Sequence, residues 1–180
     1  GMLYAGGAYR YVGDAEALLD ARVVLVLPFA AFLEELMCRG YLLQNMRDAG
    51  RPVAGVVLSS AIFAGLHVTN PAVLSFVVPV VNLLLVGVLF ALAYIASGNI
   101  WFPTALHLGW NLAEGPLLGT PVSGLEMNGW MDFEAAPGVS RLLTGGKFGL
   151  EGSLVTTGVV CAAILVLAAV LRRMRGAGSG

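Results

Sequence analysis

The stretch Phe32-Leu33-Glu34-Glu35-Leu36-Met37-Cys38-Arg39-Gly40-Tyr41-Leu42 decides the fold, because it places two adjacent carboxylates and an arginine inside an apolar run. The run extends over residues 23–43, which is close to the ~20 residues that a helix needs to cross a bilayer. A charged side chain at mid-membrane costs at least ~2.5 kcal/mol on insertion scales. The three charged side chains therefore cannot all face lipid, and we expect them to face a protein interior or a wet cavity.

Helical periodicity gives these three charged groups different surroundings. Glu35 and Arg39 are four positions apart, so they share one face of a helix and can form an ion pair. Glu34 points about 100° away around the same helix. We therefore expect Glu35 and Arg39 to neutralise each other and Glu34 to remain available for chemistry.

The composition of the whole chain indicates a polytopic membrane protein. Of its 180 residues, 58% are hydrophobic and 12% are charged, whereas a typical soluble domain carries roughly 25% charged residues. The formal net charge is −1 and the chain has no basic stripe, which argues against a nucleic-acid partner. Cys38 and Cys161 both lie in apolar runs, where cysteine most often serves as a small buried side chain.

The apolar runs predict an all-α membrane bundle with about five membrane helices. These runs cover residues 23–43, 52–69, 72–96, 100–113 and 150–171. The fourth run is short for a full crossing, so its polar residues are expected to line a cavity in the protein rather than face lipid. We predict a single domain over 14–171 that begins with a helical lead-in over 14–22, and flexible termini at 1–13 and 172–180.

The segment 114–149 is rich in glycine and proline and is too polar to span a membrane. It is either a lid that contacts the substrate or an exposed connector.

In a five-helix bundle, the arginines of the first polar loop and of the C-terminal end fall on the same side, namely Arg47, Arg51, Arg172, Arg173 and Arg175. The positive-inside rule makes that side cytoplasmic. We expect a multi-pass protein of the cell membrane, in contact with lipids, with a cytoplasmic C-terminus.

The chain has only two histidines, His67 and His107, and each lies deep in a hydrophobic segment. Either one alone could be a packed histidine that hydrogen-bonds a neighbouring helix. Ionisable groups in membrane segments are nevertheless functional candidates by default. His107 and Asn111 are four positions apart, as are Phe63 and His67, so each helix offers its polar groups on one side. This pattern favours a site at which polar side chains from separate helices converge.

Two hydrolytic chemistries fit these residues. In the first, Glu34 takes a proton from a water with His67 beside it, and His107 and Asn111 donate hydrogen bonds to the oxyanion that develops on a peptide carbonyl. In the second, Glu34, His67 and His107 bind a zinc ion that keeps a fourth position for water. The chain lacks the H-E-x-x-H signature of soluble zinc proteases, and no serine or cysteine has an evident base partner.

Three motifs occur in order on successive hydrophobic helices: E-E-x-x-x-R at Glu34, Glu35 and Arg39, F-x-x-x-H at Phe63 and His67, and H-x-x-x-N at His107 and Asn111. Together they resemble the CPBP family, which comprises the type II CAAX prenyl endopeptidases and bacterial relatives sometimes called Abi proteins. The resemblance covers about residues 23–171. Members of that family commonly have further membrane helices before the first motif.

The resemblance implies an intramembrane glutamic endopeptidase of all-α fold that acts on a peptide or protein, which in eukaryotic members is prenylated. The implied catalytic residues are Glu34 as base, His67 as its partner on the water, and His107 with Asn111 at the oxyanion, supported by Glu35, Arg39 and Phe63. No cofactor is required by this mechanism, and zinc on Glu34, His67 and His107 is the metal-dependent alternative.

Two other classes of function are compatible with the same sequence. One is a non-catalytic membrane immunity or scaffold protein of the same fold, and the other is a transporter or channel subunit with a polar lining. The set of Glu34, His67, His107 and Asn111 favours the hydrolase, since a scaffold has no need for all four.

Overall fold

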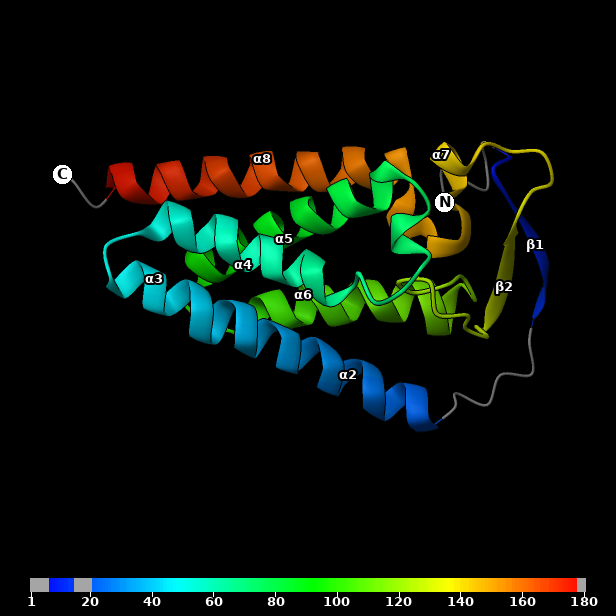
Figure 1. The fold of residues 1–180 in the computed structure, drawn as a ribbon, viewed down its shortest axis with the longest axis horizontal. Coiled ribbons are helices and arrows are strands. Elements are labelled where there is room, and N and C mark those ends of the chain that lie inside the picture. Colours follow the sequence, from blue (N-terminus) through cyan, green and yellow to red (C-terminus); the bar gives the residue numbers. More distant parts are fainter. Residues whose placement is uncertain (1–6, 15–20, 178–180) are drawn as a thin grey trace.

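The computed structural model of the chain describes residues 7–14 and 21–177. Within these residues, long helices run back and forth along one direction, and a two-stranded sheet lies at one end of them (Figure 1). The long helices are α2 (Ala21–Glu35), α4 (Pro52–Leu66), α5 (Val77–Ser97), α6 (Trp101–Leu112) and α8 (Leu154–Ala177). Helix α2 continues without a break through a π-helix (Leu36–Leu43) into α3 (Gln44–Asp48).

Turn residues set the boundaries of these helices. Gly50 has a φ of +73° just after α3, and Pro52 begins α4 at a position where its missing N–H costs no hydrogen bond. Gly98 ends α5 in the left-handed conformation, which glycine adopts without steric cost. The Asn99 side chain then accepts hydrogen bonds from the first backbone N–H groups of α6.

Each predicted apolar run contains a helix, but some boundaries differ. The third helix begins at Val77 because a 3-10 turn (Val73–Ser75) precedes it, and the last begins at Leu154 after another 3-10 turn (Leu150–Gly152). In the described part of the chain, two helices are long and apolar enough to cross a membrane, α5 and the portion Leu154–Met174 of α8. Helix α4 is apolar but shorter. A count of about five membrane helices therefore stays a prediction.

The all-α prediction is confirmed, since the chain is mostly helical, and the structure adds one small sheet that was not predicted. Strand β1 (Tyr9–Asp14) pairs antiparallel with β2 (Met131–Ala135), which lies inside the segment 114–149. The Tyr9 hydroxyl also donates a hydrogen bond to the Thr144 carbonyl at 2.6 Å. The predicted helical start at Asp14 is wrong, because Asp14 ends β1, and residues 15–20 of the predicted lead-in lie outside the described residues.

Secondary structure extends past both ends of the predicted domain. Strand β1 lies mostly within 1–13, and α8 continues to Ala177. The segment 114–149 also contains a π-helix (Ala113–Leu117), the short helix α7 (Arg141–Thr144) and a 3-10 turn (Gly146–Phe148). It forms a folded cap at the end of the bundle (Figure 1), and contact between this cap and a substrate stays a prediction.

Helix α5 is the centre of the bundle and packs against α4, α6 and α8. The contact with α4 is close at Gly87, where an added Cβ would lie 2.7 Å from the Ser60 Cα. The main core cluster draws on several elements and consists of Cys38, Phe63, Ala64, Val73, Leu83, Phe90 and Phe148. Cys38 is fully buried, as its apolar surroundings predicted.

We predict that Gly87→Ala destabilises the protein by about 1–3 kcal/mol, because the new methyl group must displace the backbone of α4. Gly158→Ala in α8 is the matched control, since a Cβ there meets no atom within 4 Å. The measurement is denaturant unfolding in detergent micelles. Equal stability of the two variants would show that the α4–α5 contact is less tight than the structure indicates.

Candidate active site

A buried ion pair occupies the middle of the bundle. The Arg39 Nη1 donates to the Glu35 Oε1 at 2.9 Å, and both side chains are fully buried. The Arg39 Nη2 donates to the Gly87 carbonyl at 2.9 Å. The pairing of Glu35 with Arg39 that the i,i+4 spacing predicted is confirmed.

His107 joins this pair from α6. Its Nδ1 lies 3.3 Å from the same Glu35 Oε1 that accepts from Arg39. The Arg39 guanidinium also lies 4.8 Å from the centroid of the Phe63 ring, and the Phe90 ring stacks on the His107 imidazole at 5.1 Å. Glu35 thus orients His107 as well as neutralising Arg39, a contact that spacing within one helix could not predict.

His67 lies at the C-terminal end of α4, and its Nδ1 is 2.9 Å from the Phe63 carbonyl oxygen. A carbonyl only accepts hydrogen bonds, so Nδ1 carries the hydrogen and Nε2 is left as an acceptor. An ionised carboxylate also only accepts hydrogen bonds, so the contact of the His107 Nδ1 with Glu35 places the ring hydrogen of His107 on Nδ1. The Phe63 ring contacts both imidazoles, with centroid distances of 5.0 Å to His67 and 5.6 Å to His107.

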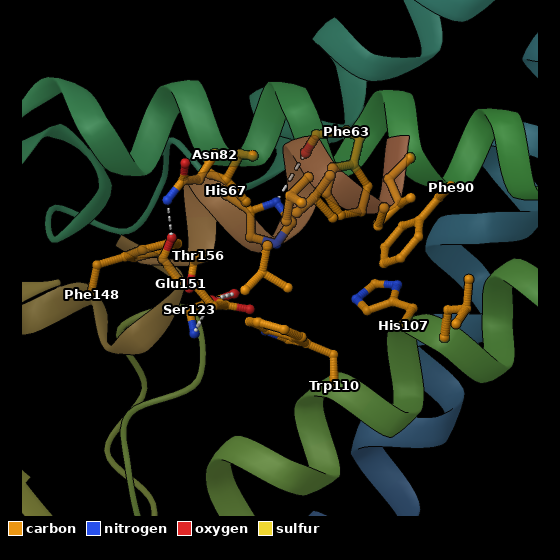
Figure 2. Close-up of a pocket in the computed structure, with 17 residues that line it drawn as sticks. Phe63, His67, Asn82, Phe90, His107, Trp110, Ser123, Phe148, Glu151 and Thr156 are labelled. Carbon is orange, nitrogen blue, oxygen red and sulfur yellow. Dashed lines mark hydrogen bonds between the residues drawn. The ribbon is translucent and has the colours of Figure 1, made fainter. Parts of the chain in front are cut away.

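Both histidines line one cavity of about 210 Å³ (Figure 2). Its walls are mostly apolar and come from α4, α5, α6 and α8 and from the segments that carry Ser123, Phe148 and Glu151. The polar side chains that line it are His67, Asn82, His107, Ser123, Glu151 and Thr156. The structure therefore brings together two predicted site residues that are far apart in the sequence.

The cavity also contains a carboxylate that sequence reasoning missed. Glu151 lies in the 3-10 turn before α8, and its Oε2 accepts hydrogen bonds from the Ser123 backbone N–H at 2.7 Å and from the Ser123 hydroxyl at 2.8 Å. Burial raises the pKa of the Glu151 carboxyl. Glu151 stands at the edge of the last apolar run and belongs to no motif, so the sequence offered no signal for it.

The Glu34 side chain lies outside the cavity that the two histidines line. It lines an open groove whose other residues are mostly apolar, Leu33, Leu36, Met37, Tyr41 and Leu66. Its Oε2 is buried and has no hydrogen-bond partner among the described residues. Asn111 is buried one turn after His107 in α6. Neither Glu34 nor Asn111 lines the cavity, although the groove residue Leu66 directly precedes His67.

The zinc alternative requires Glu34, His67 and His107 to form one ligand group. In residues 7–14 and 21–177, no three side chains of histidine, cysteine, aspartate or glutamate are grouped so that they could hold a metal ion. The two imidazoles converge on the cavity, and the third proposed ligand faces the groove.

The motifs and this arrangement agree with the comparison to known families. The family model described as type II CAAX prenyl endopeptidase Rce1-like matches residues 17–113. The chain belongs to this Rce1-like family. The match contains all three motifs and ends before Ser123 and Glu151, so those two cavity residues lie outside it. A search of curated proteins and a search of solved structures each found no significant match.

Membership of the Rce1-like family places the chain among membrane-embedded proteases that act on protein substrates. The two apolar helices that are long enough to cross a membrane agree with this setting.

We predict that Arg39→Ala destabilises the fold by about 3–5 kcal/mol, because it leaves the Glu35 carboxylate buried and without its ion-pair partner. The matched control is Arg10→Ala, which removes an exposed ion pair with Glu134 of similar length (3.1 Å) and should cost only about 0–1 kcal/mol. Chemical unfolding in micelles measures both. Similar losses for the two variants would contradict a structural role for the buried pair.

Proposed function

We propose that the chain is an intramembrane endopeptidase that hydrolyses a peptide bond with a water activated by Glu34. The observation that carries this proposal is the convergence of His67 and His107 on one cavity, with His107 anchored by the buried pair of Glu35 and Arg39. Membership of a protease family supports a peptide or protein as the substrate.

The proposed reaction uses these groups in sequence. Glu34 takes a proton from the water, and His67 holds that water through the acceptor nitrogen Nε2. The resulting hydroxide attacks the scissile carbonyl. The Asn111 amide and the Nε2 of His107, when that nitrogen carries a proton, donate hydrogen bonds to the oxyanion, and the Glu35 carboxylate at 3.3 Å from Nδ1 holds the His107 ring in place. The resemblance of the three motifs to those of the CPBP family supports these roles.

For this reaction the Glu34 carboxyl has to meet the substrate next to the cavity. Glu34 directly precedes Glu35, which contacts His107, and the groove of Glu34 reaches the end of α4 that carries His67. The buried Glu34 Oε2 has no hydrogen bond to lose when the side chain turns. Rotation of Glu34 from the groove towards the cavity is therefore part of the proposal.

We further propose a multi-pass arrangement in the cell membrane with a cytoplasmic C-terminus. The turn between α3 and α4 and the C-terminal end of α8 lie at the same end of the bundle (Figure 1). Arg47, Arg51, Arg172 and Arg173 are all exposed there. An excess of arginine on one side supports a cytoplasmic location for that side.

The test is cleavage of a defined pool of synthetic peptides, each in a free and a farnesylated form, by the purified protein in lipid nanodiscs. Mass spectrometry identifies the products. Wild-type protein should cleave at least one peptide, and Glu34→Gln should lower the rate by about 10²–10⁴-fold, because it removes the general base. Glu126→Gln, a substitution of an exposed carboxylate, is the matched control and should retain the wild-type rate.

Three outcomes would contradict the proposal in different ways. If wild-type protein cleaves no peptide, a non-catalytic immunity or scaffold role gains support. If Glu34→Gln cleaves as fast as wild type, Glu34 is not the base. If a chelator abolishes cleavage and zinc restores it, the metal-dependent mechanism replaces the one proposed here.

A further inference from the structure

The side chains that line the cavity leave few hydrogen-bonding atoms free. The Asn82 amide donates to the backbone carbonyls of Glu151 and Ser153 and accepts from the Thr157 hydroxyl. The Thr156 hydroxyl donates to the Leu150 carbonyl. Among the ionisable side chains that line the cavity, three atoms have no hydrogen-bond partner in the described part of the chain: the Nε2 atoms of the two histidines and the Oε1 of Glu151.

The hydrogen bonds from Ser123 fix which oxygen of Glu151 can carry a proton. Both Ser123 donors bind Oε2, so Oε2 acts as an acceptor and a proton on this carboxyl resides on Oε1. Figure 2 shows Glu151 held beside Ser123, on a different side of the cavity from His107. A protonated Glu151 therefore has its O–H on the oxygen that no described side chain occupies.

We propose that Glu151 is the general acid of this site, and that it protonates the amine that leaves when the peptide bond breaks. This inference rests on the proposed function, because it assumes that a peptide bond is hydrolysed in this cavity. It adds a catalytic residue from the part of the chain that the family match does not cover.

The surrounding structure fixes the position of Glu151 firmly. Among the described residues, Ser123 is the one non-glycine residue with a positive φ (+49°), a conformation that costs energy and persists where neighbours impose it. Its carbonyl accepts a hydrogen bond from the Asn70 side chain at 2.7 Å, three residues after His67. The backbone of Glu151 is fixed in turn by Asn82 from α5. Such support is typical of functional groups that must be held in one geometry.

The electrostatic setting agrees with an acid that holds its proton. Burial raises the pKa of Glu151, while the hydrogen bonds from Ser123 and the nearby His67 and His107 oppose that rise. Glu114, buried on the π-helix after α6, is a second carboxyl near Glu151, and burial together with the Glu151 charge raises the pKa of Glu114 well above its usual range. A carboxyl whose pKa is raised in this way is suited to donate a proton near neutral pH.

The proposed step balances protons and electrons. In the tetrahedral intermediate the C–N bond breaks, and its electron pair stays on nitrogen. Nitrogen takes the proton from the Glu151 Oε1, so the products are a carboxylic acid and an amine. The Glu151 carboxylate that results is stabilised by the two hydrogen bonds from Ser123. The proton that Glu34 removed from the water restores Glu151 through solvent, so the cycle consumes only the water.

The test compares an amide with its matched ester, in which an oxygen replaces the scissile nitrogen of a peptide that wild-type protein cleaves. An amine must be protonated as it leaves, whereas an alkoxide leaves much more readily without a proton. Glu151→Gln should therefore slow amide hydrolysis by about 10²-fold and ester hydrolysis by less than about threefold. The glutamine oxygen can still accept from Ser123, which keeps the loop in place.

Glu114→Gln is the matched control, because Glu114 is buried nearby but does not line the cavity. It should leave the ratio of amide to ester rates unchanged, even if it alters stability. Loss of both reactions to the same extent in Glu151→Gln, or wild-type rates for both, would overturn the role of Glu151 and leave the proposed function intact. Failure of wild-type protein to cleave any peptide would instead overturn the proposed function.

Discussion

The buried interaction of Glu35 with Arg39 is the constraint on which the rest of the structure depends. Taking two such charges out of water costs several kcal/mol for each ion, and the structure offsets this with hydrogen bonds and aromatic faces. Arg39 donates to Glu35 and to the Gly87 carbonyl, and its guanidinium lies over the Phe63 ring. The same Glu35 oxygen contacts His107. One network therefore both neutralises the interior charges and orients a side chain of the proposed site.

Two parts of the sequence contribute the residues that line the cavity. The segment that matches the Rce1-like family supplies His67, His107 and the aromatic rings that hold them. The remainder of the chain supplies Ser123, Phe148, Glu151 and residues of α8 to the wall of the same cavity. Family motifs therefore describe one part of the site, and the segments after the family match complete it. Differences between members in these segments would change the cavity without altering any motif.

Local sequence patterns predicted the features that are local in the structure. The helices follow the apolar runs, and the pairing of Glu35 with Arg39 follows from their positions on one helix face. Contacts between distant segments left no such pattern. Strand β1 pairs with a strand far along the chain, as the ion pair of Arg10 with Glu134 across 124 positions shows. The contact of His107 with Glu35, and the placement of Glu151 in the cavity, likewise depend on how the helices pack.

The most direct test of this account is an experimentally determined structure of the Glu34→Gln protein with an uncleaved peptide bound. The account predicts that the scissile amide lies in the cavity between His67 and His107, with its carbonyl oxygen within about 3 Å of a donor on His107 or Asn111. A peptide bound elsewhere, with the two imidazoles packed against each other and no room for an amide between them, would contradict it.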